Sequence, residues 1–245
     1  MIWVTGDTHG DWIHRVNMDS FPEQREMSKD DYVIILGDFG IWRDSPQQRW
    51  YLNWLEEKHF TTLFIDGNHE NYDILDSYPV EEWHGGKVHF IKPSIIHLMR
   101  GQVFDIDGLK FFTFGGAASH DISDGVLEID DPRIKEWRDD PNKMYRINHI
   151  SWWEREMPNQ KEMDEGIKNL AEHNNKVDFI LTHCTASSTA ALLSHGLYKP
   201  DKLTNYLEEI RCNVDYKHWL CGHYHDNKAI TIKDIVLYEQ IVRIA

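Results

Sequence analysis

The chain has 245 residues, with 41 acidic and 26 basic side chains and a formal net charge of −15. This charge disfavours a surface for long nucleic acids, which requires clustered Lys and Arg to displace counterions. No apolar run approaches the roughly 20 residues needed to cross a bilayer, and the first residues lack the basic and apolar regions of a signal peptide. We therefore expect a cytoplasmic protein with no membrane partner.

Short apolar runs recur along the chain, and each ends in a small or polar turn. Runs of this length, rich in β-branched and aromatic residues, predict buried strands. They cover residues 2–4, 32–36, 63–65, 179–181 and 219–221. A hairpin is predicted from residues 102–106 and 109–114, joined by Asp107-Gly108. Residues 229–244 predict two or three further strands.

Helix signatures lie between these strands. Ser45-Pro46-Gln47-Gln48 offers an N-cap, a proline at the first helical position and a glutamine at the third. Two more helices are predicted from apolar faces made of Met163, Ile167, Leu170 and Ala171, and of Leu203, Tyr206, Leu207 and Ile210. Alternating strands and helices with a strand-rich tail predict an α/β sandwich with helices outside mixed sheets.

Residues 117–158 do not fit this alternation. They are charged, rich in Asp and Trp, and too long for a plain connection. We expect a loop-rich insertion within a single domain that spans residues 1–245. Ser151-Trp152-Trp153-Glu154 predicts a capping box that opens a short helix. Trp137, Trp152 and Trp153 could form an aromatic wall for a nucleobase, but packing is the interpretation that we favour.

Polar motifs follow five of the predicted strands directly. They are Gly6-Asp7-Thr8-His9-Gly10, Gly37-Asp38, Gly67-Asn68-His69-Glu70, Thr182-His183 and Gly222-His223-Tyr224-His225. Residues at the carboxyl ends of strands in α/β sheets converge on one crevice. Seven O and N ligands could therefore meet there, namely Asp7, His9, Asp38, Asn68, His183, His223 and His225.

This mixture of carboxylate, amide and imidazole suits two divalent metal ions. The carboxylate of Asp38 has two oxygens and could bridge two ions roughly 3.5–4 Å apart. Two such ions supply four positive charges, of which Asp7, Asp38 and a bridging hydroxide would neutralise three. The site would keep a positive surplus within an acidic protein, and a phosphate would be drawn to it.

The motifs GDTHG, GDFG, GNHE, TH and GHYH, in this order, resemble the calcineurin-like metallophosphoesterase superfamily. The resemblance spans Asp7 to His225 and implies the family's four-layer sandwich of two mixed β-sheets flanked by α-helices. It implies one metal ion on Asp7, His9, Asp38 and His225, and a second on Asp38, Asn68, His183 and His223. His69 matches the family histidine that contacts the phosphate and assists departure of the leaving group.

Residues 115–154 resemble, more loosely, a small prokaryotic and phage subgroup of these enzymes. The second motif departs from the protein serine/threonine phosphatases, because Ile41 stands where they have an Asp and Arg43 falls one place late. This departure disfavours a protein phosphatase and leaves open which group orients His69. Asp44 and Asp73 are the candidates.

We therefore expect a metal-dependent phosphoric ester hydrolase in which metal-bound hydroxide attacks a phosphomonoester or a phosphodiester. Asp38, Asn68 and His69 are the expected catalytic residues, and Mn²⁺ or Fe the expected metals, with Zn²⁺ as the alternative. The expected partner is a small phosphorylated substrate, with nucleotides among the candidates. The competing hypothesis is a non-catalytic metal-binding scaffold or interaction module on the same fold. The completeness of the ligand set favours the enzyme.

Several residues near these motifs have simpler interpretations. Cys184 and Cys221 adjoin candidate ligands, but without a secretion signal we interpret them as reduced, buried small hydrophobes. Glu70 is expected to support its loop and not to bind metal. Arg146 could touch a substrate phosphate, although a solvated side chain is favoured. The histidines outside the motifs, including His59, His120 and His149, are expected to be solvated or structural.

Overall fold

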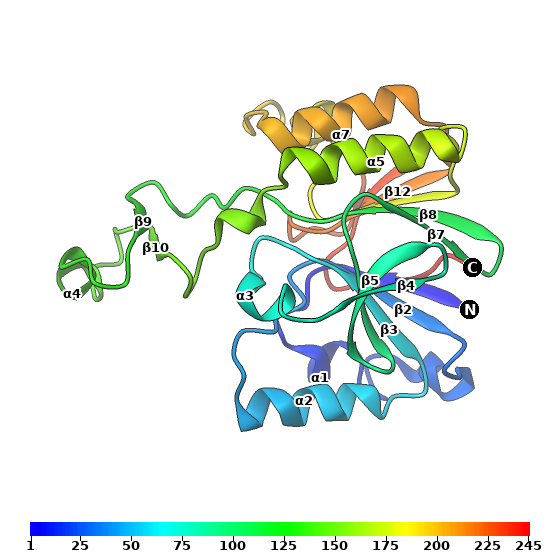
Figure 1. The fold of residues 1–245 in the computed structure, drawn as a ribbon, viewed down its shortest axis with the longest axis horizontal. Coiled ribbons are helices and arrows are strands. Elements are labelled where there is room, and N and C mark those ends of the chain that lie inside the picture. The colour runs from blue at the N-terminus through cyan, green and yellow to red at the C-terminus, as the bar shows by residue number, and fades with distance from the viewer.

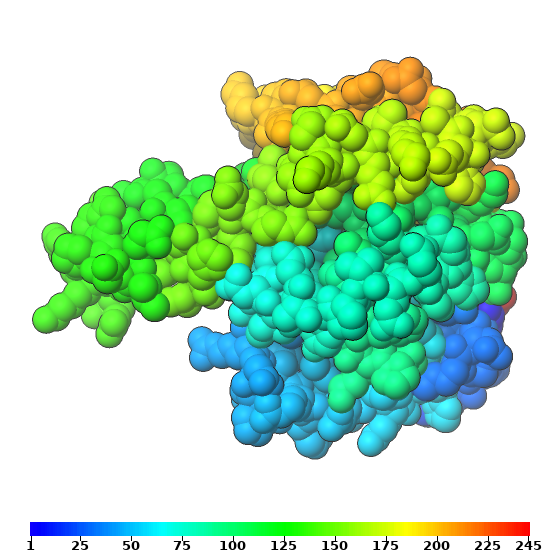
Figure 2. All heavy atoms as spheres, in the orientation of Figure 1, coloured from blue at the N-terminus to red at the C-terminus, as the bar shows by residue number.

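The computed structural model describes all 245 residues. Two mixed β-sheets lie face to face, and helices cover the outer side of each (Figure 1). The α/β sandwich predicted from the sequence is thereby confirmed. The middle of residues 117–158 projects from this body as an arm (Figure 2), whereas the two ends of that segment, the root of the arm, lie against the body.

The first sheet has seven strands. In spatial order they are β15 (Ile241–Arg243), β1 (Ile2–Thr5), β2 (Tyr32–Leu36), β3 (Thr61–Ile65), β6 (Ile95–Leu98), β5 (Gly86–Lys92) and β4 (Val80–Trp83). Strands β1, β2, β3 and β6 are parallel, whereas β15, β5 and β4 pair antiparallel at the two sides.

The second sheet has six strands. In spatial order they are β13 (Lys228–Ala229), β14 (Asp234–Val236), β12 (His218–Cys221), β11 (Phe179–Thr182), β8 (Leu109–Phe114) and β7 (Gln102–Ile106). The four central strands are parallel, and β13 and β7 are antiparallel to their neighbours. The predicted hairpin is therefore β7–β8, with the predicted bounds.

The helices form three sets, one beside each sheet and one in the arm and its root. The helices α1 (Trp12–Arg15), α2 (Pro46–Glu56) and α3 (Tyr72–Leu75), with the 3-10 helix η1 (Pro22–Glu26), follow strands of the first sheet. The helices α5 (Gln160–Glu172), α6 (Ser187–Ser194) and α7 (Lys202–Asn213) accompany the second sheet. The arm and its root contain β9 (Gly125–Leu127), α4 (Arg133–Trp137), β10 (Tyr145–Ile147) and the 3-10 helix η2 (Glu154–Glu156). No helix is both long and apolar enough to span a bilayer.

The layers follow from which face of each strand is apolar. All five residues of β2 are buried, as expected for a strand covered on both faces. Ile34 and Leu36 face the second sheet and join the core between the sheets. Val33 and Ile35 face the other way and join a core with residues of α1 and α2. A third core joins the second sheet to α5 and α7, so three apolar cores separate four layers.

The helix predictions are confirmed except for one face. Ser45 caps α2 by accepting the backbone N–H of Gln48 at 3.1 Å, and all four predicted core residues of α7 are buried. In α5 the prediction that Ile167 and Ala171 are buried is wrong, because both are exposed. Gly166 takes the buried position instead, since a Cβ there would lie 2.3 Å from the Tyr206 hydroxyl of α7. The missing side chain at Gly166 leaves room for Tyr206 beside α5.

The arm contains a few short elements between its loops. Strands β9 and β10 pair in parallel, and α4 lies at the far end (Figure 1). The capping box predicted at Ser151 is wrong, because the Ser151 hydroxyl accepts the N–H of Ile147 at 2.9 Å and the short helix η2 begins only at Glu154. Trp153 is buried against the first sheet, whereas Trp137 packs edge-on against Tyr145 in the arm. These two tryptophans pack in different places.

A buried charged network underlies the loop that follows β3. The Asp66 carboxylate accepts from Arg100 Nε at 2.7 Å and from the Tyr72 hydroxyl at 2.9 Å. Burial alone would raise the pKa of Asp66, but the Arg100 guanidinium and His97 outweigh it and lower the pKa. Arg100 also donates to the backbone carbonyl of Arg155 at 2.8 Å. The network therefore ties the Asn68 loop to the root of the arm.

We predict that Asp66→Ala destabilises the protein by about 3–5 kcal/mol, because the variant leaves the Arg100 guanidinium buried without its counter-charge. Urea denaturation at pH 7 measures the change. Asp139→Ala, on the exposed part of the arm, is the control and should stay within about 0.5 kcal/mol of the wild type.

The same substitution should alter the pH dependence. The folded-state pKa of Asp66 lies below the usual value, so its contribution is fully present above about pH 4 and is lost as the pH falls further. The stability difference between wild type and Asp66→Ala should shrink on acidification. A difference that stays constant between pH 7 and pH 3 would contradict the assigned ion pair.

Candidate metal centre

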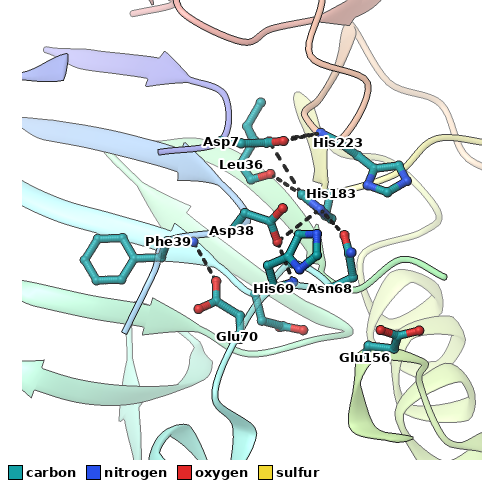
Figure 3. A network of polar contacts seen from close by, with 12 residues as sticks. Asp7, Leu36, Asp38, Phe39, Asn68, His69, Glu70, Glu156, His183 and His223 are labelled. Atoms are coloured by element: carbon teal, nitrogen blue, oxygen red, sulfur yellow. Dashed lines mark hydrogen bonds and ion pairs between the residues drawn. The ribbon is translucent and has the colours of Figure 1, made fainter. Parts of the chain in front are cut away.

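The five polar motifs all lie at the carboxyl ends of parallel strands. Asp7, Asp38 and Asn68 follow β1, β2 and β3 of the first sheet, and His183 and His223 follow β11 and β12 of the second. Strands within each set are parallel neighbours, so their carboxyl ends share one edge. Figure 3 shows these side chains converging where the edges of the two sheets meet.

Two groups of ligand atoms converge, and Asp7 belongs to both. The first contains Asp7, His9 and His225, and the second contains Asp7, Asp38 and His183. His225 Nε2 lies 3.2 Å from Asp7 Oδ2 and 3.1 Å from His9 Nε2. In the second group His183 Nε2 lies 3.5 Å from Asp38 Oδ1. The structure therefore brings five of the seven expected ligands into two adjoining groups.

Asp38 extends the second group toward His9, and Asn68 lies beside it. Asp38 Oδ2 lies 3.7 Å from His9 Nδ1, whereas Oδ1 faces His183. The two oxygens thus lie near different histidines, although only Asp7 belongs to both groups. Asn68 Oδ1 lies 3.1 Å from His183 Nε2, which places the amide oxygen beside the second group.

His223 is held differently from the other expected ligands. It belongs to neither convergent group, although its ring lies 5.0 Å from that of His183. Its backbone N–H donates to Asp7 Oδ1 at 2.9 Å, and its ring Nε2 lies 3.1 Å from Nε2 of His120.

The backbone around the ligands is strained. His9, Asp38, His223 and His225 all have positive φ, between 46° and 65°. Non-glycine residues in this region are uncommon and cluster at functional sites. Two glycines permit the close approach of the loops, since a Cβ at Gly67 would lie 2.0 Å from Asp38 Oδ1 and one at Gly222 would lie 2.1 Å from Asp7 Oδ1. The local fold is built around the two carboxylates.

The electrostatics fit a cation. Asp7 and Asp38 are each 1% exposed, and neither carboxylate pairs with a Lys or Arg side chain. Burial alone would raise the pKa of Asp7, but the neighbouring His183 and His225 lower it. Burial lowers the pKa of His9, and lowers that of His223 well below its usual value.

His183 completes this picture, because burial lowers its pKa but the Asp38 and Asp7 carboxylates outweigh it and raise the pKa. Buried carboxylates and imidazoles together form a donor set that suits divalent metal ions. The residues present therefore fit two such ions.

His69 lies beside the centre without joining it. Its backbone N–H donates to Asp38 Oδ1 at 2.7 Å, and its ring centroid lies 5.8 Å from that of His9. Burial lowers the pKa of its ring. Neither Asp44 nor Asp73, the two candidates for orienting His69, contacts the His69 ring. Asp44 pairs with Arg49 instead, and Asp73 accepts from His149 and Trp153.

The arm brings an ion pair close to this histidine. Arg146 pairs with Asp121, and the two charges act in opposite directions on the pKa of His69. Arg146 is therefore not simply solvated, as the sequence suggested. Both residues belong to the predicted insertion, residues 117–158.

Three residues at the centre escape the sequence motifs. Ser119 accepts from Asn68, His120 contacts His223, and Glu156 accepts from Ser119. A signal was available, because Gly115-Gly116 follows β8 as other glycines follow β2 and β3, and Ser119-His120 comes next.

The remaining neighbours behave as expected. Glu70 accepts the backbone N–H groups of Phe39 and Gly40 and so supports the loop of Asp38. Cys184 and Cys221 are buried without a disulfide, and burial raises the pKa of both thiols.

The sequence matches the calcineurin-like phosphoesterase family model over residues 1–227. The chain belongs to this family. Its members are metal-dependent phosphoesterases, which agrees with the buried Asp and His groups. The fold is also similar to that of phosphopantetheinyl hydrolase (PptH) from Mycobacterium tuberculosis, with 13% identity, a TM-score of 0.42, and coverage of 97% of this chain and 89% of that one. No curated protein sequence matches the chain.

We predict that Asp38→Asn weakens binding of at least one metal ion, because the variant removes a full charge and a bridging oxygen from a buried site. Elemental analysis should find about two ions per wild-type chain and fewer in the variant. Asp44→Asn, in the same loop but exposed, should keep the wild-type content. Full metal content in Asp38→Asn would contradict the assignment of Asp38.

Proposed function

We propose that the protein is a binuclear metal-dependent phosphoesterase that hydrolyses a phosphomonoester or phosphodiester of a small molecule, with nucleotides among the candidates. The observation that carries the proposal is the pair of adjoining ligand groups that share Asp7, within a chain of this family. The lack of any basic partner for the two buried carboxylates supports it.

The proposed ligands follow the family pattern. The first ion would be held by Asp7, His9, Asp38 and His225, and the second by Asp38, Asn68, His183 and His223. The mixture of carboxylate, amide and imidazole without thiolate favours Mn²⁺ or Fe, with Zn²⁺ as the alternative. The split orientation of the Asp38 oxygens supports its place between the ions.

When bound, the two ions would lower the pKa of a water molecule and stabilise negative charge on the phosphoryl oxygens. The chain's own contribution is positioning and proton transfer. Asp38 and Asn68 hold their oxygens toward the centre, and the His69 ring lies beside it, 5.8 Å from the ring of His9. We assign to His69 the donation of a proton or hydrogen bond to the leaving oxygen.

The alternative, a non-catalytic scaffold on the same fold, predicts no turnover even when metal is bound. A panel of phosphomonoesters and phosphodiesters assayed with and without Mn²⁺ separates the two. Turnover that requires the metal supports the enzyme, and the preferred leaving group indicates the substrate class. A fully metal-loaded protein that hydrolyses no member of the panel would favour the scaffold.

We predict that His69→Ala retains both metal ions but loses roughly 10²–10⁴ in rate, the usual worth of general acid–base catalysis. The loss should be smaller for an aryl ester than for an alkyl ester, because a nitrophenolate needs little protonation whereas an alkoxide needs much. His59→Ala, at an exposed position, is the control.

Equal losses on both esters would remove the leaving-group role and point to phosphate positioning. Loss of metal together with activity would instead make His69 a ligand.

A further inference from the structure

Three ligands proposed for the second ion make a hydrogen bond through an atom other than the one that would bind the ion. His183 Nδ1 lies 2.7 Å from the backbone carbonyl of Leu36. A carbonyl oxygen only accepts, so Nδ1 carries the proton and Nε2 is left for the ion. Such contacts fix the tautomer and direction of a ligating histidine.

Asn68 is oriented by Ser119 in the same way. The Ser119 hydroxyl donates to Glu156 Oε2 at 2.6 Å, and its backbone N–H donates to Oε1 at 2.9 Å. Because the hydroxyl proton is engaged, its oxygen accepts Asn68 Nδ2 at 3.2 Å. The amide oxygen of Asn68 then faces the centre. Glu156 and Asn68 are both visible in Figure 3, on the arm side of the site.

His223 makes the third such contact, with His120. The two Nε2 atoms lie 3.1 Å apart, which leaves Nδ1 as the ring nitrogen of His223 that is available to an ion. Aromatic packing supports the ring of His120. It stacks on Tyr198 with centroids 6.1 Å apart, and Tyr198 stacks on Tyr224 with centroids 5.5 Å apart.

We propose that Ser119 and His120, at the root of the arm, are positioning residues that hold Asn68 and His223 for the second metal ion. The proposal rests on the binuclear centre proposed above. In this arrangement His223 donates its Nε2–H to Nε2 of His120, which carries its own proton on Nδ1.

The arm serves one ion and not the other. No hydrogen bond joins residues 117–158 to Asp7, His9 or His225, the three ligands proposed for the first ion alone. Those ligands are supported by the body instead. Arg15 donates to the backbone carbonyl of Asp7 at 2.9 Å, and Tyr238 stacks on His225 at 4.5 Å. Changes at Ser119 or His120 should therefore act on the second ion selectively.

Titration calorimetry of the full-length, chelator-stripped protein with Mn²⁺ tests this selectivity. The wild type should bind two ions. In His120→Ala, and in Ser119→Ala, one site should weaken by about 10–100-fold while the other is unchanged, the usual effect of removing an outer hydrogen-bond partner. His120→Gln keeps an acceptor and should restore most of the lost affinity.

His149→Ala is the matched control, because His149 also lies on the arm and makes a hydrogen bond, to Asp73, but none to a ligand. It should bind both ions as the wild type does. Two unchanged sites in His120→Ala, or an equal weakening of both, would overturn the proposal while leaving the phosphoesterase intact. A wild type that binds no ion would refute the proposed function, and this inference with it.

A spectroscopic measurement separates orientation from simple structural support. In the Zn²⁺-loaded wild type with ¹⁵N-labelled histidine, NMR should show His223 protonated at Nε2. His120→Ala should change the shift of that nitrogen and speed its proton exchange. His223 protonated at Nδ1, or bound to Zn²⁺ through Nε2, would show that His120 does not act in this way.

Discussion

The structure depends on two carboxylates buried where the edges of two sheets meet. Asp7 and Asp38 are each 1% exposed and have no basic side chain as a partner. A buried charge without compensation is costly. The two carboxylates therefore need bound protons or cations to remain buried in the folded protein. Histidines supply partial compensation, which is why the pKa of His183 is raised although burial alone would lower it. Divalent ions would compensate the charge fully.

The strained backbone has the same origin. Four expected ligands lie in the left-handed region, and each follows a strand directly or by a few residues. A chain leaving a strand end must turn sharply to aim a short carboxylate or imidazole at a point shared by two sheets. The glycines at positions 67 and 222 remove the Cβ atoms that would otherwise meet those carboxylates. Strain and close approach are thus consequences of bringing five loops to one point.

The sequence predicted what lies in short, regular segments. The apolar runs gave the strands of residues 32–36 and the β7–β8 hairpin with their observed bounds, and the polar motifs at strand ends led to the converging groups. Within residues 80–98, the exposed edge strand β4 has little apolar content and therefore no pattern typical of a buried strand. The short apolar run of β6 was not among the predicted strands. Long-range packing also escaped prediction, as the small buried Gly166 shows. The contact of His120 with His223 could not be predicted, because the two residues are 103 positions apart in the sequence.

Besides the contact of His120 with His223, two routes join the root of the arm to the Asn68 loop. Arg100 links Asp66, just before the Asn68 loop, to the backbone of Arg155, while Glu156 links through Ser119 to Asn68 itself. Both routes end on neighbouring residues of η2 and on one loop of the first sheet. Local unfolding of the arm's root would therefore release Asn68, whereas the ligands specific to the first ion would keep their contacts with Arg15 and Tyr238. The ligands proposed for the two ions are thus supported by different parts of the chain, the body for the first ion and the root of the arm for the second. The arm, although it projects from the sandwich, therefore helps to hold the site.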